Sequence, residues 1–258
     1  MALASALLKH YAIAKLTPTP WSSIDAHLTR DTRGKPVYTD PATHEQPVAF
    51  NVSHQDGVVV LVAVAHYPAD YGTVEVGVDV VSTTERRGRD LEMVGKGEGG
   101  WREFVDMHAD VLAPGEVRRL KELRPAFGLG EQRHDGQLRA FYALWALREA
   151  YVKLTGEALL AEWLRELEFR DCGPPRPTAA WEVPADEAAG ELLRLGDVWF
   201  KGKRVEDVKV CLGSVGPGFM IATAVRTPGN AEDGLGWKLG LYEELSLEEV
   251  LGFARASG

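Results

Sequence analysis

Three side chains in one predicted helix could together bind a phosphate-bearing substrate. Residues 141–156 have the residue types of a helix, and they place Trp145, Glu149 and Lys153 one turn apart on one face. The rest of that face is largely apolar, so a carboxylate and an ammonium on it would be costly without partners. A metal ion and an anionic ligand would be such partners. An ordinary Glu–Lys ion pair on a solvated helix face would explain the spacing equally well.

A second carboxylate interrupts an otherwise apolar strand. Asp79 lies in the run Val-Gly-Val-Asp-Val-Val, which predicts a strand over residues 74–81, and Gly77 permits another group to approach the backbone closely. A carboxylate there suits Mg²⁺, which takes one or two protein carboxylates and completes its shell with phosphate oxygens and water. An edge strand, a bulge or a solvent-facing position would also account for the aspartate.

Polar residues also lie in the predicted link between two apolar strands. Strands are expected over residues 48–52 and 58–65, and the segment between them has the length and the glycine of a hairpin turn. Ser53 and His54 in this link can both donate hydrogen bonds to phosphate, and Lys35 could add a positive charge. A turn histidine is more often an ordinary surface residue, so none of these signals is specific alone.

The elements that must position these residues are helices and strands in no strict alternation. Helical patterns cover residues 2–16, 101–111, a segment beginning at Pro114, and 246–254; strand patterns cover residues 164–169, 198–200, 208–213 and 219–225. Residues 84–100 indicate a loop or short helix, residues 132–137 a loop, and residues 173–190 a flexible segment rich in proline and alanine. This mixture favours an α+β fold over a doubly wound sheet.

Composition narrows the class of protein. With 258 residues, 45% of them hydrophobic and 26% charged, the chain can bury the core of a soluble globular protein. The net charge of −9 argues against nucleic-acid binding, and no apolar run has the length of a membrane span. The N-terminal segment is interpreted as an amphipathic helix rather than a signal peptide. Cys172 and Cys211 fit no metal spacing, and so few thiols suit the cytoplasm.

The three polar groups follow one another in an order that resembles an enzyme family. Residues 50–54, 76–79 and 145–153 are similar to the three signature motifs of the 4′-phosphopantetheinyl transferases of the larger, monomeric, surfactin-synthetase-activating type. Within that family the likeness is strongest to the broad-range enzymes of filamentous fungi. It extends over most of residues 1–226.

The resemblance implies a reaction and its partners. The enzyme would transfer the 4′-phosphopantetheine arm of coenzyme A to a serine hydroxyl of an acyl or peptidyl carrier protein domain, releasing adenosine 3′,5′-bisphosphate. Carrier domains of fatty acid synthase, polyketide synthase, nonribosomal peptide synthetase and aminoadipate reductase are the candidate acceptors. A monomer in the cytoplasm is expected, with no nucleic-acid or membrane partner.

The resemblance also implies roles for single residues. Asp79 and Glu149 would hold Mg²⁺ on the pyrophosphate of coenzyme A, and Glu149 is in addition the natural general base for the carrier serine. Lys153 and His54 would contact phosphate, with Ser53 as a further donor, and Lys35 would lie near the 3′-phosphate.

The implied fold has two similar subdomains related by a pseudo-twofold axis, with the active site in the cleft between them. Residues 1–73 would form the first subdomain, residues 74–226 the second, which carries the metal and catalytic motifs, and residues 227–258 a tail. The family normally has several dozen residues before the first helix seen here. The first subdomain is therefore expected to lack an edge strand. The sequence leaves two explanations open: the chain is a truncated form, or its affinity for coenzyme A is reduced.

Several residues depart from the family pattern or fall outside it. Val81 stands where many bacterial members have a glutamate, so water would replace one metal ligand. Arg148 replaces a common lysine and, being off the Glu149 face, is expected to face the carrier or solvent. The small basic patch of Arg86, Arg87 and Arg89 could meet an acidic carrier helix, but the sequence favours a solvated loop. The remaining histidines fit no ligand spacing; they are His44, His66, His108 and His134.

Two other functions remain open from the sequence. One is a truncated relative that binds carrier proteins but transfers nothing. The other is a Mg²⁺-dependent hydrolase of the coenzyme A pyrophosphate, which needs the same metal and cations but no carrier surface.

Overall fold

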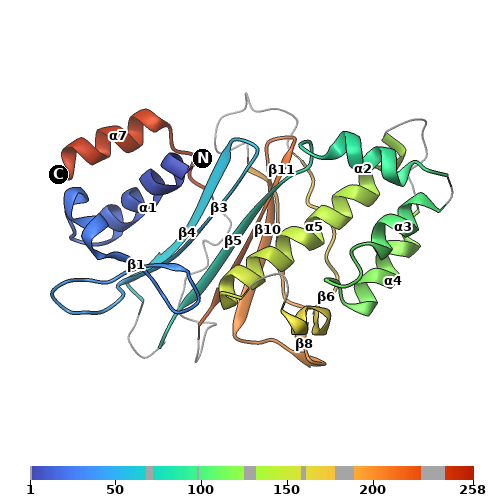
Figure 1. The fold of residues 1–258 in the computed structure, drawn as a ribbon, viewed down its shortest axis with the longest axis horizontal. Helices are drawn as coiled ribbons and strands as arrows, with labels where there is room; N and C mark the ends of the chain where they lie inside the picture. The colour runs from blue at the N-terminus through green and yellow to red at the C-terminus, as the bar shows by residue number, and fades with distance from the viewer. Residues whose placement is uncertain are drawn as a thin grey trace.

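The computed structural model describes residues 2–67, 72–97, 99–124, 132–157, 161–177, 189–227 and 242–258. Helices and strands mix irregularly along this part of the chain, which confirms the α+β prediction (Figure 1). In chain order the elements are α1 (Ala2–Leu16), η1 (Trp21–His27), β1 (Leu28–Arg30), β2 (Pro36–Tyr38), β3 (Val48–Gln55), β4 (Val58–Ala65), β5 (Glu75–Ser82), α2 (Arg87–Val94), α3 (Gly100–Asp106), α4 (Pro114–Glu122), α5 (Gln132–Thr155), η3 (Glu162–Glu166), β6 (Leu167–Phe169), β7 (Ala189–Leu195), β8 (Val198–Phe200), β9 (Lys203–Arg204), β10 (Val208–Val215), β11 (Phe219–Arg226) and α7 (Leu247–Ala256).

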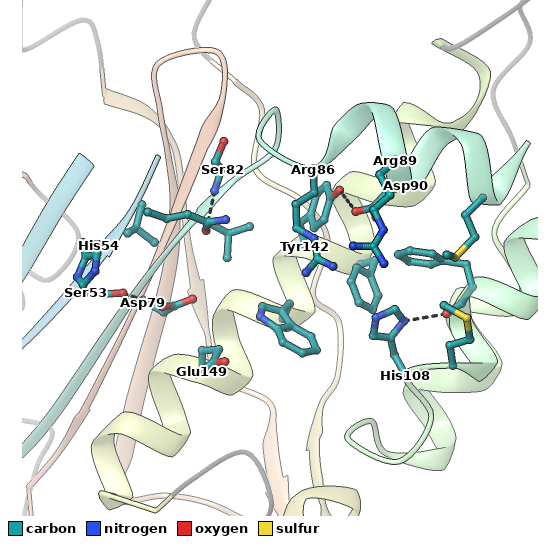
Figure 2. Close-up of a pocket in the computed structure, with 18 of the residues that line it drawn as sticks. Ser53, His54, Asp79, Ser82, Arg86, Arg89, Asp90, His108, Tyr142 and Glu149 are labelled. Carbon is teal, nitrogen blue, oxygen red and sulfur yellow. Dashed lines mark hydrogen bonds between the residues drawn. The ribbon is translucent and has the colours of Figure 1, made fainter. Parts of the chain in front are cut away.

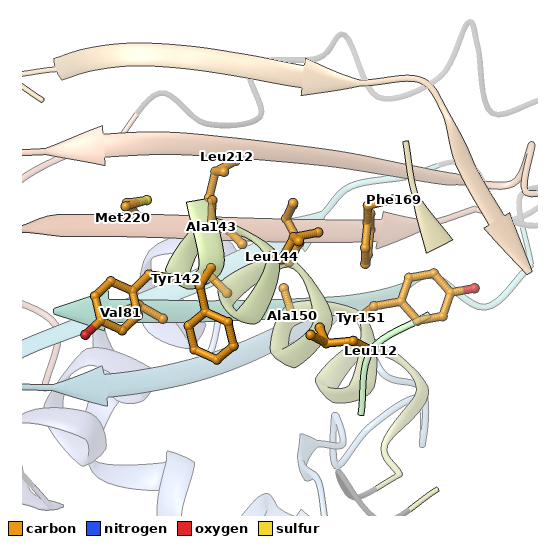
Figure 3. Close-up of a cluster of buried hydrophobic side chains, with 14 of the residues drawn as sticks. Val81, Leu112, Tyr142, Ala143, Leu144, Ala150, Tyr151, Phe169, Leu212 and Met220 are labelled. Atoms are coloured by element: carbon orange, nitrogen blue, oxygen red, sulfur yellow. The ribbon is translucent and has the colours of Figure 1, made fainter. Parts of the chain in front are cut away.

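The long helix α5 packs across an antiparallel sheet with the strand order β5-β11-β10-β7. Its apolar face meets the sheet in the largest hydrophobic cluster of the described residues, which includes Ala143 and Ala150 of the helix and Leu212 and Met220 of the sheet (Figure 3). The pairing of β5 with β11 places Ala222 opposite Asp79. The core therefore holds α5 directly over the strand that carries the suspected metal ligand.

Gly77 sets the distance between α5 and β5. A Cβ atom added at this glycine would lie 2.0 Å from the carbonyl oxygen of Ala150 and 2.5 Å from the amide nitrogen of Leu154. No side chain fits in that space, so the helix backbone rests on the strand backbone. The predicted close approach at Gly77 is confirmed, and the approaching group is α5 itself.

A second helix-on-strand unit precedes this one. Helix α1 packs on the β3–β4 hairpin around a core formed by Ile13, Ile24, Tyr38, Val48 and Phe50. Helix α7 lies beside α1, where the rings of Tyr11 and Phe253 have centroids 4.9 Å apart (Figure 1). Both units thus consist of a helix laid on antiparallel strands.

The hairpin and the sheet meet along the free edge of β5 without sharing a backbone ladder. Side chains of β3 make the connection instead: Asn51 Oδ1 accepts a hydrogen bond from the Val78 amide at 3.0 Å, and Gln55 Oε1 accepts one from the Ser82 amide at 3.1 Å. Because side chains alternate along a strand, Ser53 lies between these two residues on the same side of β3. This row of side chains brings the first unit to Asp79.

Several element boundaries differ from the sequence predictions. Ser53 and His54 belong to β3 rather than to the turn, which is confined to Asp56 and Gly57, with φ angles of 48° and 84°. An Asp-Gly pair accepts positive φ at both positions and so closes a two-residue hairpin. Helix α5 begins at Gln132, so the loop predicted over residues 132–137 is wrong. A single glycine costs a helix only about 1 kcal/mol relative to alanine, so Gly136 does not interrupt it.

The remaining differences are smaller. Helix α3 ends at Asp106, Leu164 belongs to the 3₁₀ turn η3 rather than to a strand, and β7 was not foreseen. Most of the segment predicted to be flexible, residues 178–188, lies outside the described residues. Among the described helices, none combines the length and the apolar character that crossing a membrane requires.

Candidate functional site

A cavity of about 280 Å³ lies between strands β3 and β5, helix α5 and the helices α2 and α3. It brings together five of the six residues predicted to act: Ser53, His54, Asp79, Glu149 and Lys153. Figure 2 shows Ser53, Asp79 and Glu149 at one end of this pocket and Arg86, Arg89 and His108 at the other, with α5 passing between.

Asp79, Ser53 and Lys153 form a tight polar group at the first end. The Lys153 ammonium donates hydrogen bonds to Asp79 Oδ1 at 2.6 Å and to Ser53 Oγ at 2.7 Å, and the Ser53 hydroxyl donates to Asp79 Oδ1 at 2.9 Å. Asp79 is only 6% exposed. Burial raises the pKa of its carboxyl group, and the adjacent Lys153 ammonium opposes that shift. The cation therefore allows a carboxylate to exist on a buried strand.

Glu149 lies one helical turn before Lys153 and differs from Asp79 in having no such partner. It is half-buried, and within the described part of the chain its carboxylate makes no hydrogen bond or ion pair. Burial and the nearby charge of Asp79 raise its pKa, while Lys153 opposes the increase. A carboxylate of this kind has both oxygens available to a ligand.

The two carboxylates fit a site for a hard cation. In the described ranges no group of three or more His, Cys, Asp or Glu side chains could hold a metal ion. Mg²⁺, however, is commonly held by one or two carboxylates and takes its other ligands from substrate phosphates and water. Asp79 and Glu149 line the same pocket and supply that minimal set.

His54 is exposed at the edge of the pocket, where a bound anion could reach it. Lys35 lies elsewhere. Its ammonium donates to the carbonyl oxygens of Leu154 at 3.1 Å and Val76 at 3.2 Å, close to the C-terminus of α5, and Lys35 does not line the pocket. Burial lowers the pKa of its ammonium group. Its predicted contact with a 3′-phosphate remains a prediction.

The far end of the pocket is apolar with a basic rim, and it was largely missed by sequence reasoning. Its walls come from side chains of α2, α3, the residue that follows α3, and α5, namely Met93, Phe104, Met107, Phe141, Tyr142 and Trp145. Arg86, in the turn before α2, and Arg89, on α2, are both exposed, and both also line the pocket. Within the described residues neither forms an ion pair, whereas Arg87 pairs with Asp135. The i, i+4 spacing of residues 89 and 93 on α2 was the available signal.

Arg148 corrects a further prediction. It is 1% exposed and so does not face solvent or a carrier. Neighbouring residues on a helix point about 100° apart. Because Glu149 points into the pocket, the preceding Arg148 points away from it. There it meets Glu116 of α4 and the carbonyl oxygens of Leu164 and Leu167.

Comparison with known proteins agrees with this geometry. Residues 1–66 match a family model described as "4′-phosphopantetheinyl transferase, N-terminal", and residues 75–197 match one described as "4′-phosphopantetheinyl transferase superfamily". The chain is 44% identical to 4′-phosphopantetheinyl transferase 1 of Fusarium mangiferae, over 98% of this chain and 77% of the relative.

Further relatives lie at lower identity. 4′-Phosphopantetheinyl transferase A of Aspergillus fumigatus is 36% identical over 89% of this chain and 72% of its own length. The human L-aminoadipate-semialdehyde dehydrogenase-phosphopantetheinyl transferase is 28% identical over 65% of this chain and 46% of its own length. Because two family models and fungal relatives that align over most of this chain all point to the same family, the chain belongs to the 4′-phosphopantetheinyl transferases.

Proposed function

We propose that the pocket around Asp79 and Glu149 is where this transferase moves the 4′-phosphopantetheine arm of coenzyme A to a serine hydroxyl of a carrier protein domain. The observation that carries this proposal is the convergence of two carboxylates and one ammonium of β5 and α5 in a single pocket, beside Ser53 and His54 of β3. Attack on a pyrophosphate builds negative charge on oxygen, and such a set of groups suits its stabilisation.

The bond changes assign a role to each side chain. The serine oxygen attacks the β-phosphorus of coenzyme A, a phosphodiester bond to the carrier forms, and the bond from that phosphorus to the oxygen of adenosine 3′,5′-bisphosphate breaks. Glu149 accepts the serine proton, directly or through one water. Its raised pKa and its lack of a hydrogen-bond partner among the described residues support this role as general base.

The other polar residues bind the phosphates. Lys153 supplies a positive charge next to Asp79, and Ser53 and His54 can donate hydrogen bonds to non-bridging oxygens. Asp79 and Glu149 would hold Mg²⁺. When bound, the ion would neutralise charge on the pyrophosphate and on the leaving oxygen.

The acceptors that we propose are the carrier domains of fatty acid synthase, polyketide synthase and nonribosomal peptide synthetase. Aminoadipate reductase is included because the human relative is named for an L-aminoadipate-semialdehyde dehydrogenase. We further propose that the protein acts as a monomer in the cytoplasm. The small number of cysteines supports a reducing compartment.

Mass spectrometry of a carrier domain tests the function. The protein is incubated with Mg²⁺, coenzyme A and an apo carrier domain, and the carrier should gain the mass of one phosphopantetheine group. The gain should disappear in Glu149→Gln and Asp79→Asn. It should persist in Glu122→Gln, which removes an exposed glutamate from α4, outside the pocket.

Two results would contradict the proposal. Carrier binding without any gain in mass would indicate a binding protein. Cleavage of coenzyme A without labelling of the carrier would indicate a pyrophosphate hydrolase.

A further inference from the structure

We propose that Arg148 is a positioning residue for this reaction: through its buried pair with Glu116 it sets the rotation of α5 that turns Glu149 and Lys153 into the pocket. The inference rests on the proposed function, because the pair is taken to orient the side chains of that active site. The pair itself lies outside the pocket lining.

Arg148 is surrounded by acceptors that come from three different segments. Its Nη1 donates to the Leu164 carbonyl oxygen at 2.8 Å, and its Nη2 donates to the Leu167 carbonyl oxygen at 2.6 Å and to Glu116 Oε2. Leu164 belongs to η3, Leu167 to β6 and Glu116 to α4. A planar guanidinium can satisfy all three acceptors in only a narrow range of orientations.

Glu116 is fixed just as firmly. It is fully buried, its Oε2 accepts the amide hydrogen of Ala113 at 2.9 Å, and its Oε1 accepts the amide hydrogen of Phe169 at 2.8 Å. Independently of Arg148, the Glu116 carboxylate therefore joins the start of α4 to β6. The arginine adds α5 to this rigid group.

The geometry of the pair points to orientation rather than to stability alone. Buried ion pairs can often be replaced by apolar residues without loss of stability, so folding by itself does not require one. Arg148 also keeps its Nε atom buried with no acceptor among the described residues. The guanidinium thus holds its three directed contacts while leaving one donor unpaired.

The opposite side of α5 rests on the sheet, where Gly77 fixes how near α5 lies to β5 and apolar side chains such as Ala150 pack in the core. The directed hydrogen bonds of Arg148 add a restraint on the rotation of the helix from the other side. Arg148 directly precedes Glu149, so a rotation of the helix moves both together. When Arg148 is held in place on the buried side, Glu149 is therefore oriented toward the pocket.

Replacing the whole pair separates an effect on the orientation of Glu149 from an effect on stability. In the double variant Glu116→Met/Arg148→Met an apolar contact replaces the charges, and circular dichroism and thermal unfolding report whether the fold is kept. We expect kcat for carrier labelling to fall on the order of ten- to a hundredfold, since a small misplacement of reacting groups has effects of this size. KM for coenzyme A should rise by less than kcat falls, because Lys153 turns with the helix while Ser53 and His54 of β3 stay in place.

Two further variants complete the design. Arg148→Lys keeps a charge that can reach Glu116 but loses the planar fork, so its kcat should lie between those of the wild type and the double variant. Val105→Ala, a fully buried residue of α3 that does not line the pocket, serves as the control that is destabilised without losing the pair. It should keep the wild-type kcat wherever it is folded.

Each outcome decides the inference. Wild-type kcat in a folded double variant would overturn it, and so would an equal loss of kcat in Val105→Ala at matched stability. If the double variant does not fold, wild-type kcat in Arg148→Lys overturns the inference and a selective loss of kcat supports it. Absence of carrier labelling by the wild-type protein would instead refute the proposed function, and the role of Arg148 with it.

Discussion

Helix α5 carries an ion pair on each of two faces, and the two pairs differ in what they leave unsatisfied. On the buried side, the side chains of Arg148 and Glu116 are 1% and 0% exposed. On the pocket side, the side chains of Lys153 and Asp79 are 27% and 9% exposed, and Glu149 lies beside them without a hydrogen-bonded partner among the described residues.

The difference separates a structural pair from a site. Both oxygens of Glu116 are occupied by donors of the chain itself, so nothing remains for a ligand. At the pocket, two carboxylates share one ammonium, and the surplus negative charge can be offset by a cation. Charged residues of one helix can thus serve the fold or the chemistry, and the partners decide which.

The strongest test of this contrast is Glu149→Gln. The substitution keeps the shape of the side chain but removes the base and a metal ligand, so kcat should fall by about 10²–10⁴-fold. The free energy of unfolding, measured with urea, should stay the same or rise, because a partly buried charge has been removed. A clear loss of stability would show that Glu149 also has a structural role.

Glu116→Gln, in contrast, should lower the stability of the protein. It leaves Arg148 buried without its counter-charge, which costs about 3–5 kcal/mol of unfolding free energy. Urea denaturation of the variant beside the wild type measures this loss. Unchanged stability would contradict the structural assignment of the buried pair.

Gly77→Ala tests the contact that holds α5 close to Asp79. The added methyl group would meet backbone atoms of α5, so we expect a loss of about 1–3 kcal/mol in unfolding free energy together with a lower kcat. Gly136→Ala is the matched control in α5 itself, where an added Cβ meets nothing within 4 Å. It should stabilise the protein by roughly 0.5–1 kcal/mol. Equal behaviour of the two variants would contradict the close contact.

Substitutions in the basic rim, Arg86 and Arg89, should affect binding of the carrier more than binding of coenzyme A. Reversing the charges in Arg86→Glu/Arg89→Glu should raise KM for an acidic carrier domain several-fold, mainly through slower association at low salt. KM for coenzyme A should change little, and the exposed Arg102→Glu on α3 should leave both constants unchanged. A larger effect on coenzyme A would move the phosphate-binding region to this end of the pocket.

The smallest effect concerns the dependence of stability on pH. The pKa values of Asp79 and Glu149 are both raised by burial, so between the unfolded and folded pKa values the folded state binds more protons. These two groups therefore favour the folded state most at low pH. Their contribution falls as pH rises above about 4. Urea denaturation of wild type and Glu149→Gln across this range should show a shallower fall in the variant; parallel curves would contradict the raised pKa of Glu149.

Local patterns predicted much of the architecture and the site. The strands at β4, β5, β10 and β11 follow from runs of β-branched residues, and the spacing within α5 placed Glu149 and Lys153 together. The strand position of His54 was missed because a two-residue Asp-Gly turn suffices where five residues were allowed.

What failed depended on contacts between distant segments. Arg148 is buried only because α4, η3 and β6 cover its side of α5, and these segments lie up to 32 residues away in the chain. Arg86 and Arg89 reach the pocket only because α2 folds back beside α5. Neither packing arrangement leaves a local pattern in the sequence.

The row of β3 side chains along the edge of β5 has a consequence for how the molecule opens. Since hairpin and sheet share no backbone ladder, they can separate as two cooperative units without either losing its own strand pairing. The amide hydrogens of Val78 and Ser82, protected by Asn51 and Gln55, would exchange with solvent at the rate of that separation. A substrate that binds both units would slow it, so the exchange of these two amides reports how tightly a ligand joins the halves of the enzyme.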